Sequence, residues 1–399
     1  MGLAASLPRG GSTPLGIRAT RLWIIGLLLA SGALMPRALS AESDGPVIGV
    51  ALHRGGPVMI GSADQRLRVE SRDFAEELAP GRQELRFLED EAYFGGWQFR
   101  SALRIRASDG VTAVGDRRYE GWIEVLPPNK AGEPWLVVNR LPMERYLVGV
   151  VGNEMPRSFE PAALAAQAIA SRTYALYQLM SRAQGTRVHV SASTASQVYR
   201  GVETDARVRA AVASTRGQVL LFDGHLFESF FSSTCGGATA SGAEILNAPR
   251  IRPLEPVVCG YCAGTQYAAW TLDLPEPRVR AALAPFCQEH GIVLETIRTI
   301  APVEVGPGGH ASYVRIDHTG GSFELDAGAF RRQLGTDVIY STSFTCRLSD
   351  ERLHFEGHGY GHGVGMCQVG AQALAKDGRD PVAIVQFYYE GASVVVLWE

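Results

Sequence analysis

The sequence lacks a strong charge of either sign. Among 399 residues there are 38 lysines and arginines and 41 aspartates and glutamates, so the formal net charge is −3. A protein that binds nucleic acid usually carries a basic excess, so we expect no nucleic acid as a partner. Internal repeats and low-complexity linkers are also absent. The chain is therefore an ordinary globular protein with room for two domains, or for one domain with a large insertion.

After residue 41 the sequence has no long apolar segment. Before it, Arg9, Arg18 and Arg21 precede an apolar run at 22–34, and small residues follow at 38–41. This pattern predicts a secretory signal peptide over residues 1–41. The run is too short for a comfortable membrane span. We expect an exported protein of the periplasm or cell envelope, with no stable membrane span after cleavage.

Turn residues divide the rest of the chain. Short alternating apolar runs between glycine-rich turns predict a β-rich module at 45–125, and Pro127-Pro128-Asn129-Lys130 marks a boundary or hairpin. A core domain is expected at 135–399, with an insertion or lid at about 250–350. The predicted fold class is α+β: a β-rich core packed around a long central helix, with an α/β insertion.

The central stretch runs from 150 to 178. An apolar, strand-like run at 146–151 breaks at Gly152, and Glu154 stands before Met155-Pro156. A helix with a buried stripe of small residues is expected from Pro161. Burial between strand and helix would raise the pKa of the Glu154 carboxyl, as a general acid requires. The alternative is a glutamate near a helix start with no chemistry.

Two further stretches stand out. The segment 217–232, with Asp223-Gly224 at its centre, predicts a β-hairpin. Near the C-terminus, His358 and His362 alternate with five glycines at 357–365. Such glycine density excludes an ordinary helix, and favours a tight loop that places imidazoles and backbone N–H groups in a cleft. The alternative is a structural turn with satisfied histidines.

Several motifs occur in a fixed order: Gly-Asn-Glu154-Met-Pro, Ala-Gln167-Ala-Ile-Ala-Ser-Arg172-Thr-Tyr174, Gln197-Val-Tyr199-Arg-Gly, Thr-Cys235-Gly-Gly-Ala-Thr and Gly-His362-Gly-Val-Gly-Met-Cys367-Gln368. Together they resemble the SpoIID/LytB family, the stage II sporulation protein D and amidase-enhancer group. The resemblance implies a peptidoglycan lytic transglycosylase. Such an enzyme cleaves the MurNAc–GlcNAc bond of glycan strands without water and leaves a 1,6-anhydroMurNAc end.

The family's catalytic glutamate corresponds to Glu154, and one carboxylate suffices for this chemistry, whereas ordinary glycosidases use two. The residues we expect to bind substrate are Gln167, Arg172, Tyr174, Tyr199, His358, His362 and Gln368. No cofactor is required for catalysis. Two alternatives remain: a non-catalytic enhancer that binds a cell-wall amidase through the insertion at 250–350, and a wall-binding module.

All six cysteines lie after residue 230. Export favours disulfides, whereas the Cys259-Gly-Tyr-Cys262 spacing is a zinc half-site. A structural zinc ion held by Cys235, Cys259, Cys262 and Cys367 is one hypothesis, and paired disulfides are the other. With zinc bound, Cys287 and Cys346 would be left as a disulfide pair.

Overall fold

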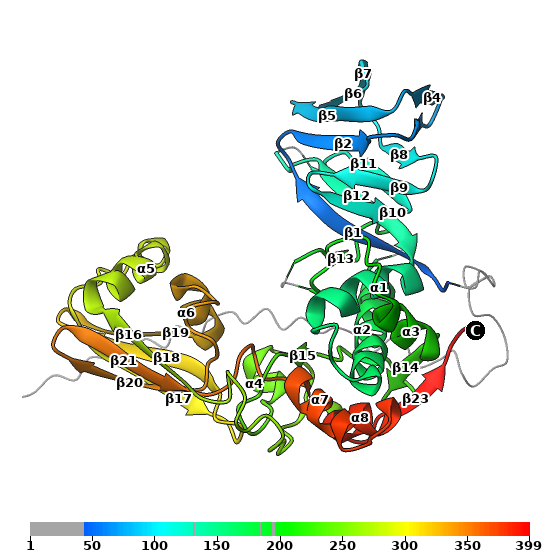
Figure 1. Ribbon diagram of the computed structural model, residues 1–399. Coiled ribbons are helices and arrows are strands. Elements are labelled where there is room, and N and C mark those ends of the chain that lie inside the picture. The colour runs from blue at the N-terminus through cyan, green and yellow to red at the C-terminus, as the bar shows by residue number, and fades with distance from the viewer. Residues whose placement is uncertain (1–43, 131, 184, 194–195) are drawn as a thin grey trace, which may run out of the picture. The chain divides into compact units, whose positions relative to one another are not determined.

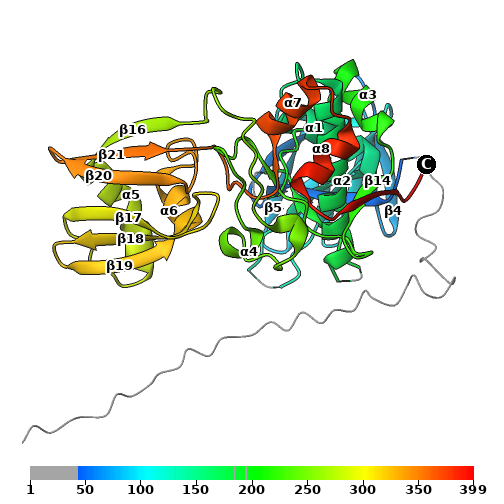
Figure 2. The same cartoon turned by 90° about the horizontal axis from the view of Figure 1, so that it is seen from below.

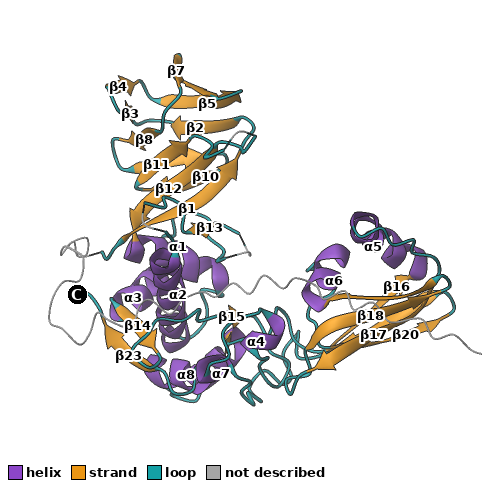
Figure 3. Cartoon of the chain, turned by 180° about the vertical axis from the view of Figure 1, so that it is seen from behind, coloured by secondary structure: helices purple, strands orange, loops and turns teal. Residues whose placement is uncertain are grey.

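A computed structural model shows the fold and describes residues 44–130, 132–183, 185–193 and 196–399. Strands alone occupy residues 47–142, and helices and mostly antiparallel strands are interspersed after them, which confirms the α+β class (Figure 1; Figure 3). The expected signal peptide, 1–41, lies outside the described residues. Within them, no helix has both the length and the apolar character needed to cross a membrane.

The N-terminal part consists of two sheets over a shared apolar core. The strands follow from the alternation of apolar and polar residues. In Leu103–Ala107 every second residue is buried, and the arginines between them are exposed. The strands are β1 (Val47–Arg54), β2 (Val58–Ser62), β3 (Leu67–Ser71), β4 (Phe74–Leu78), β5 (Gly81–Leu88), β6 (Glu91–Phe94), β7 (Trp97–Phe99), β8 (Leu103–Ala107), β9 (Val111–Val114), β10 (Arg117–Glu120), β11 (Trp122–Leu126) and β12 (Leu136–Pro142).

The larger sheet has the strand order β13-β1-β12-β11-β8-β3-β4, where β13 is Val190–Ser191, and the smaller sheet has the order β10-β9-β2-β5-β6-β7. Because β12 pairs with both β1 and β11, the sheet continues past residue 125, the expected end of the module. The segment at 127–130 lies in the connection between the antiparallel strands β11 and β12.

The expected strand at 146–151 is wrong, because these residues belong to helix α1 (Met143–Glu154). A six-residue apolar run fits either structure, and here Tyr146, Leu147 and Val150 are buried at helical spacing. The helix ends at Glu154, since Pro156 cannot donate a hydrogen bond and keeps Met155 extended.

The expected central helix is present as α2 (Pro161–Ser181), with Pro161 in its first turn. Every residue from Ala163 to Leu176 is buried. The alanines allow close packing by α1, α3 (Ala206–Ser214), α7 (Gln368–Lys376), α8 (Pro381–Tyr388) and β14 (Gln218–Leu221). The polar side chains of α2 are therefore enclosed as well.

The expected hairpin at 217–232 forms its turn but not its strand pair. Asp223 and Gly224 have φ of 49° and 78°. However, β14 pairs with β23 (Ser393–Val396), and β15 (Phe231–Ser232) pairs in parallel with β22 (Met366–Cys367). The second pairing aligns the segment before Cys235 with the segment before Gln368.

Beyond α4 (Gly242–Ile245) and a short 3-10 helix (Arg252–Leu254), the chain builds a second apolar core. Two three-stranded sheets lie beside α5 (Glu276–Glu289) and α6 (Ala327–Leu334) (Figure 2). Their strands are β16 (Trp270–Pro275), β17 (Ile297–Val305), β18 (Ala311–His318), β19 (Gly321–Asp326), β20 (Phe344–Ser349) and β21 (Arg352–Gly357).

Candidate active site and candidate metal centre

Glu154 is the last residue of α1, and its carboxyl is held from two directions. The Val198 backbone N–H donates to Oε1 over 2.6 Å, and the Gln368 side chain also hydrogen-bonds to the carboxyl. Burial is the largest influence and raises the pKa of Glu154, while the two hydrogen bonds partly offset it. The carboxyl is thus biased toward its protonated form, as a general acid must be.

A chain of amides holds Gln368 in place. Its Nε2 lies 3.4 Å from Gln167 Oε1, and Gln167 Nε2 donates to Ser171 Oγ over 2.9 Å. Gln167 and Ser171 lie one turn apart on the buried helix α2 and have no solvent exposure. The structure therefore brings Gln368 to Glu154 and Gln167 to Gln368. Gln167 is fully buried, so it positions Gln368 and does not reach a substrate, which corrects its assignment to substrate binding.

Two further polar residues join this network that sequence reasoning did not select. The Tyr146 hydroxyl donates to Gln197 Oε1 over 2.9 Å, and Gln197 Nε2 donates to the Ser171 carbonyl over 3.2 Å. Burial raises the pKa of Tyr146 well above its usual value, so the hydroxyl stays neutral. The sequence offers one indication of Gln197: it immediately precedes Val198, whose backbone N–H donates to Glu154.

Tyr174 and His362 lie on either side of Phe230. The ring centroids of Tyr174 and Phe230 are 6.0 Å apart, as are those of Phe230 and His362. Burial lowers the pKa of His362 to about 4, and its Nδ1 accepts the Val364 N–H over 3.0 Å. The imidazole is therefore neutral, and it stabilises the glycine-rich loop as a hydrogen-bond acceptor.

His358 belongs to a different environment. It is exposed, its Nδ1 lies 3.1 Å from the Ala268 carbonyl oxygen, and it lines a groove of about 650 Å³ between β17 and β20. The two histidines of the loop are thus separated: His362 is half-buried beside Phe230, and His358 is exposed in the insertion.

Arg172 does not line a cleft, which corrects its assignment to substrate binding. Its side chain has no exposure, and its guanidinium donates to both carboxylate oxygens of Glu144, over 2.9 and 2.8 Å. The Trp398 indole and the Gly217 backbone N–H complete the shell around Glu144. The sequence motif here maintains a buried ion pair that ties α1, α2 and the C-terminus together.

Tyr199 is likewise a structural residue. It is 1% exposed, its hydroxyl donates to Asn139 Oδ1 over 2.8 Å, and its ring packs against Tyr119 and Tyr146. It joins the N-terminal sheet to α1 and fixes the loop that carries Val198. Because both its hydroxyl and its ring are engaged within the protein, it has no group free to bind a substrate.

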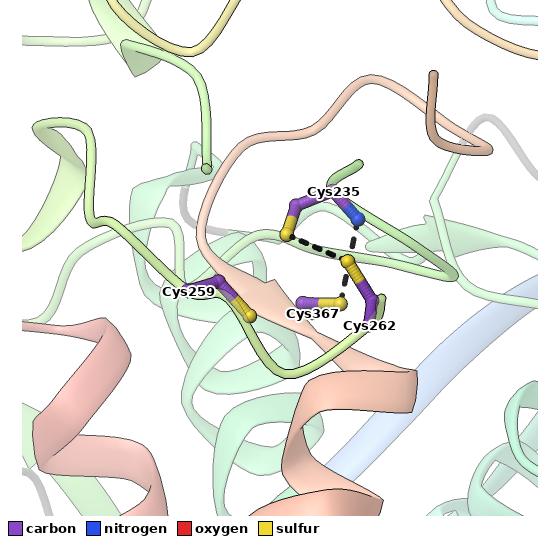
Figure 4. Close-up of side chains that lie close together, drawn as sticks. All are labelled: Cys235, Cys259, Cys262 and Cys367. Atoms are coloured by element: carbon purple, nitrogen blue, oxygen red, sulfur yellow. Dashed lines mark hydrogen bonds between the residues drawn. The ribbon is translucent and has the colours of Figure 1, made fainter. Parts of the chain in front are cut away.

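The four cysteines of the zinc hypothesis converge in one buried cluster, and their sulfur atoms all lie within 4.8 Å of one another (Figure 4). The Sγ atoms of Cys235 and Cys262 are 3.6 Å apart. Glycine makes this packing possible: a Cβ on Gly370 would lie 2.8 Å from Cys259 Sγ. The backbone N–H groups of Cys235 and Gly370 point at Cys367 Sγ, over 3.4 and 3.3 Å.

This geometry fits a tetrahedral zinc ion. Zinc–sulfur bonds of about 2.3 Å place the sulfurs of a tetrahedron about 3.8 Å apart, which is near the separation found here. The two backbone N–H donors would stabilise thiolate charge on Cys367. A disulfide would need a sulfur–sulfur distance near 2.05 Å.

The expected disulfide between Cys287 and Cys346 is wrong, since both cysteines are free. Cys287 lies on α5 within the insertion core, whereas Cys346 lies on β20 and lines the groove beside β17. Burial raises the pKa of each thiol, to about 12 for Cys346, so both are poor nucleophiles.

The chain is similar in sequence to several known proteins. A family model described as stage II sporulation protein matches residues 131–222, and a model described as a domain of unknown function matches 262–365. An uncharacterised protein of Brachyspira hyodysenteriae is 32% identical over 299 residues, covering 74% of this chain and 77% of its own. Stage II sporulation protein D of Bacillus subtilis is 28% identical, covering 64% and 75%. The amidase enhancer of the same species is 28% identical, covering 62% and 40%.

Proposed function

Because this chain belongs to the stage II sporulation protein D family, we propose that it is a peptidoglycan lytic transglycosylase with Glu154 as its general acid and base. One observation carries the proposal. The Glu154 side chain is half-buried, its pKa is raised, and its carboxyl is oriented by two hydrogen bonds. Among the described residues, no second carboxylate contributes to this pKa, which fits a single-carboxylate mechanism better than hydrolysis by a pair.

The reaction balances with one carboxyl group. Protonated Glu154 gives its proton to the bridging oxygen as the bond from MurNAc C1 to that oxygen breaks. The resulting carboxylate then accepts the proton of the C6 hydroxyl while O6 bonds to C1, which forms the 1,6-anhydro ring and restores the acid. The Val198 N–H and the Gln368 amide hold the carboxyl in place through both steps.

The chain's own neutral groups would receive the sugar. Tyr174 and His362 flank the Phe230 ring, and the neutral imidazole brings no charge to oppose the cationic character of the transition state. Arg172 is neutralised by Glu144. Stabilisation of that state is therefore left to Glu154 and to the surrounding amide dipoles.

Purified, peptide-free glycan strands test this proposal, with the wild type and Glu154→Gln compared side by side. Anhydro-ended products from the wild type alone would support it. Products with reducing ends would indicate hydrolysis by water and would contradict it.

A second candidate function is the enhancement of a cell-wall amidase, favoured by the similarity to the amidase enhancer of Bacillus subtilis. In that case amidase activity would rise when this protein is added, Glu154→Gln would enhance as well as the wild type, and a deletion within 270–357 would abolish the effect. Export to the cell envelope, expected from the N-terminal pattern, belongs to either function.

We also propose that Cys235, Cys259, Cys262 and Cys367 hold a structural zinc ion. Four protein ligands leave no open position for a substrate, so the ion would contribute stability rather than chemistry. Cys367 directly precedes Gln368 and accepts the Gly370 N–H at the start of α7. The centre would therefore fix the residue that orients Glu154.

A further inference from the structure

The outer face of the larger N-terminal sheet carries a concentration of arginines, which we call the arginine face. Residues that stand opposite each other on neighbouring strands lie on the same side of a sheet, so the strand register shows which residues belong to this face. Arg68 pairs with Arg106, Glu70 with Arg104, Glu124 with Arg104, and Trp122 with Arg140. The face comprises Arg66, Arg68, Arg104, Arg106, Arg140 and Arg187, together with Glu70, Glu77, Glu124 and Trp122.

The carboxylates of this face are too few for its guanidinium groups. Glu70 is shared by Arg68 and Arg104, and Glu124 by Arg140 and Arg187. Arg106 has no ion pair among the described residues. Six arginines against three glutamates leave three excess positive charges, although the whole chain has a net charge of −3. The excess is thus local to this face.

Arg68 and Arg106 are neighbours on this face, where Arg68 also pairs with Glu70 and Arg106 lies over the Trp122 ring. Arg68 and Arg106 stand directly opposite each other on β3 and β8, and like charges in that position repel. Both are exposed, so nothing in the protein's interior requires this pairing. A bound anion would remove the repulsion, and this is the reason to regard the face as a binding surface.

Trp122 orients the guanidinium groups but does not offer a free ring. The guanidinium carbons of Arg104 and Arg106 lie 4.8 and 5.7 Å from its ring centroid. A stacked guanidinium keeps its N–H groups directed outward in its own plane, where they can donate to an anion in pairs. A sugar that stacked on this ring would have to compete with these two guanidinium groups.

We propose that the arginine face binds a wall polymer whose repeating units are joined by phosphodiester groups. Arginine matches phosphate oxygens with paired hydrogen bonds. Neighbouring strands are about 4.8 Å apart, and residues on the same side of one strand are about 6.7 Å apart. The arginines therefore lie as close together as the phosphate groups of a polyol phosphate. A peptide-free glycan has only one carboxylate per disaccharide, so its charges are more widely separated.

The choice of a wall polymer rests on the proposed function, whereas the anion-binding property does not. The face is formed by β3, β8, β11 and β12 and includes none of the residues assigned to Glu154 or to the cysteine cluster. Binding there would hold the protein on the wall while a neighbouring glycan strand is processed. The two activities can therefore be measured separately.

The test uses the mature chain, a fluorescent polyphosphate and purified poly(glycerol phosphate), with binding followed by anisotropy over a range of salt concentrations. The wild type should bind both probes, more weakly as salt rises. Arg68→Gln/Arg106→Gln should weaken binding at least tenfold and should reduce the slope of log K against log salt by about 1.4 to 1.8, the value for two lost phosphate contacts.

A matched double variant provides the control. Arg86→Gln/Arg315→Gln removes two arginines of similar exposure, 68% and 47%, that lie outside the face, and it should bind like the wild type. The Arg68→Gln/Arg106→Gln protein should melt near the wild-type temperature, because it loses a like-charge repulsion together with one exposed ion pair and one cation–π contact. It should cleave polymer-free glycan at the wild-type rate. Glu154→Gln should bind the polymer normally even if its glycan activity is lost.

Four results would overturn the inference: no binding of either probe by the wild type, equal loss in both double variants, binding only to vesicles of anionic phospholipid, or a slower cleavage of polymer-free glycan by the folded Arg68→Gln/Arg106→Gln protein. The last result would assign the face to the glycan strand. Failure of glycan cleavage in all proteins, with polymer binding intact, would contradict the proposed enzyme but not this site.

Discussion

Gln368 hydrogen-bonds to the Glu154 carboxyl while its amide also reaches the Gln167 side chain on the central helix. The two contacts join the end of α1, the middle of α2 and the start of α7. The position of the proposed acid is therefore set by two consecutive helices, by a third helix near the C-terminus, and by the cysteine that directly precedes Gln368.

Gln368→Ala should slow glycan cleavage by roughly tenfold, the equivalent of about 1.4 kcal/mol in the barrier, and should shift its pH profile. The hydrogen bond from Gln368 lowers the pKa of Glu154, so its removal raises that pKa further. The acid then stays protonated to higher pH, and the alkaline limb of the profile moves upward. Gln372→Ala, on the same helix, should leave the limb in place. An unshifted profile in Gln368→Ala would refute this role.

Glu154→Gln should make the protein more stable at neutral pH. The folded-state pKa of Glu154 lies above its ordinary value of 4.5, so this carboxyl favours the folded state below that value, and the contribution is lost as pH rises through the folded pKa. Glutamine has no proton to lose. Denaturation from pH 4 to 8 should show the two proteins converging at the acid end. A variant that is less stable at every pH would contradict the burial of this carboxyl.

Arg172→Met should destabilise the protein by about 3–5 kcal/mol, because it leaves Glu144 buried without its partner. Urea denaturation measures the loss. Glu144→Gln/Arg172→Met should recover part of it. A variant with wild-type stability but weakened glycan binding would instead restore Arg172 to the substrate site.

The purified protein should contain one zinc ion per chain. At a free zinc concentration of a hundred times the dissociation constant, binding stabilises the folded protein by about 2.7 kcal/mol. A chelator should remove this stabilisation and should also slow glycan cleavage. Cys262→Ser should abolish metal binding, whereas Cys287→Ser should retain it. Three disulfides and no metal, by thiol counting and elemental analysis, would exclude the centre.

The central helix could be predicted because it leaves a local pattern in the sequence. The role proposed for Glu154 came from the family motif, and the cluster of four cysteines from one Cys-x-x-Cys pair together with the order of the family motifs. The role of Arg172 could not be predicted. Polar residues on a helix usually mark the side that faces solvent, and this rule led to the wrong assignment of Arg172. In α2 every residue from Ala163 to Leu176 is buried, so no such side exists there. The apolar run at 146–151 was too short for its periodicity to distinguish a strand from a helix.

The pairing of strands that are distant in sequence could not be predicted either. The partner of β14 lies at the C-terminus, so a correct turn at Asp223-Gly224 still led to a wrong hairpin. The arginine face depends on strand register in the same way. A net charge near zero gives no sign of it, and only the alignment of β3 with β8 brings Arg68 opposite Arg106.

Mass spectrometry of the soluble products from peptide-free glycan strands tests the central claim most directly. The wild type should release fragments with 1,6-anhydroMurNAc ends, and folded Glu154→Gln should release at least about a hundredfold less, in keeping with the loss of a general acid. Reducing-end fragments from the wild type, or anhydro-ended fragments from both proteins alike, would contradict the account.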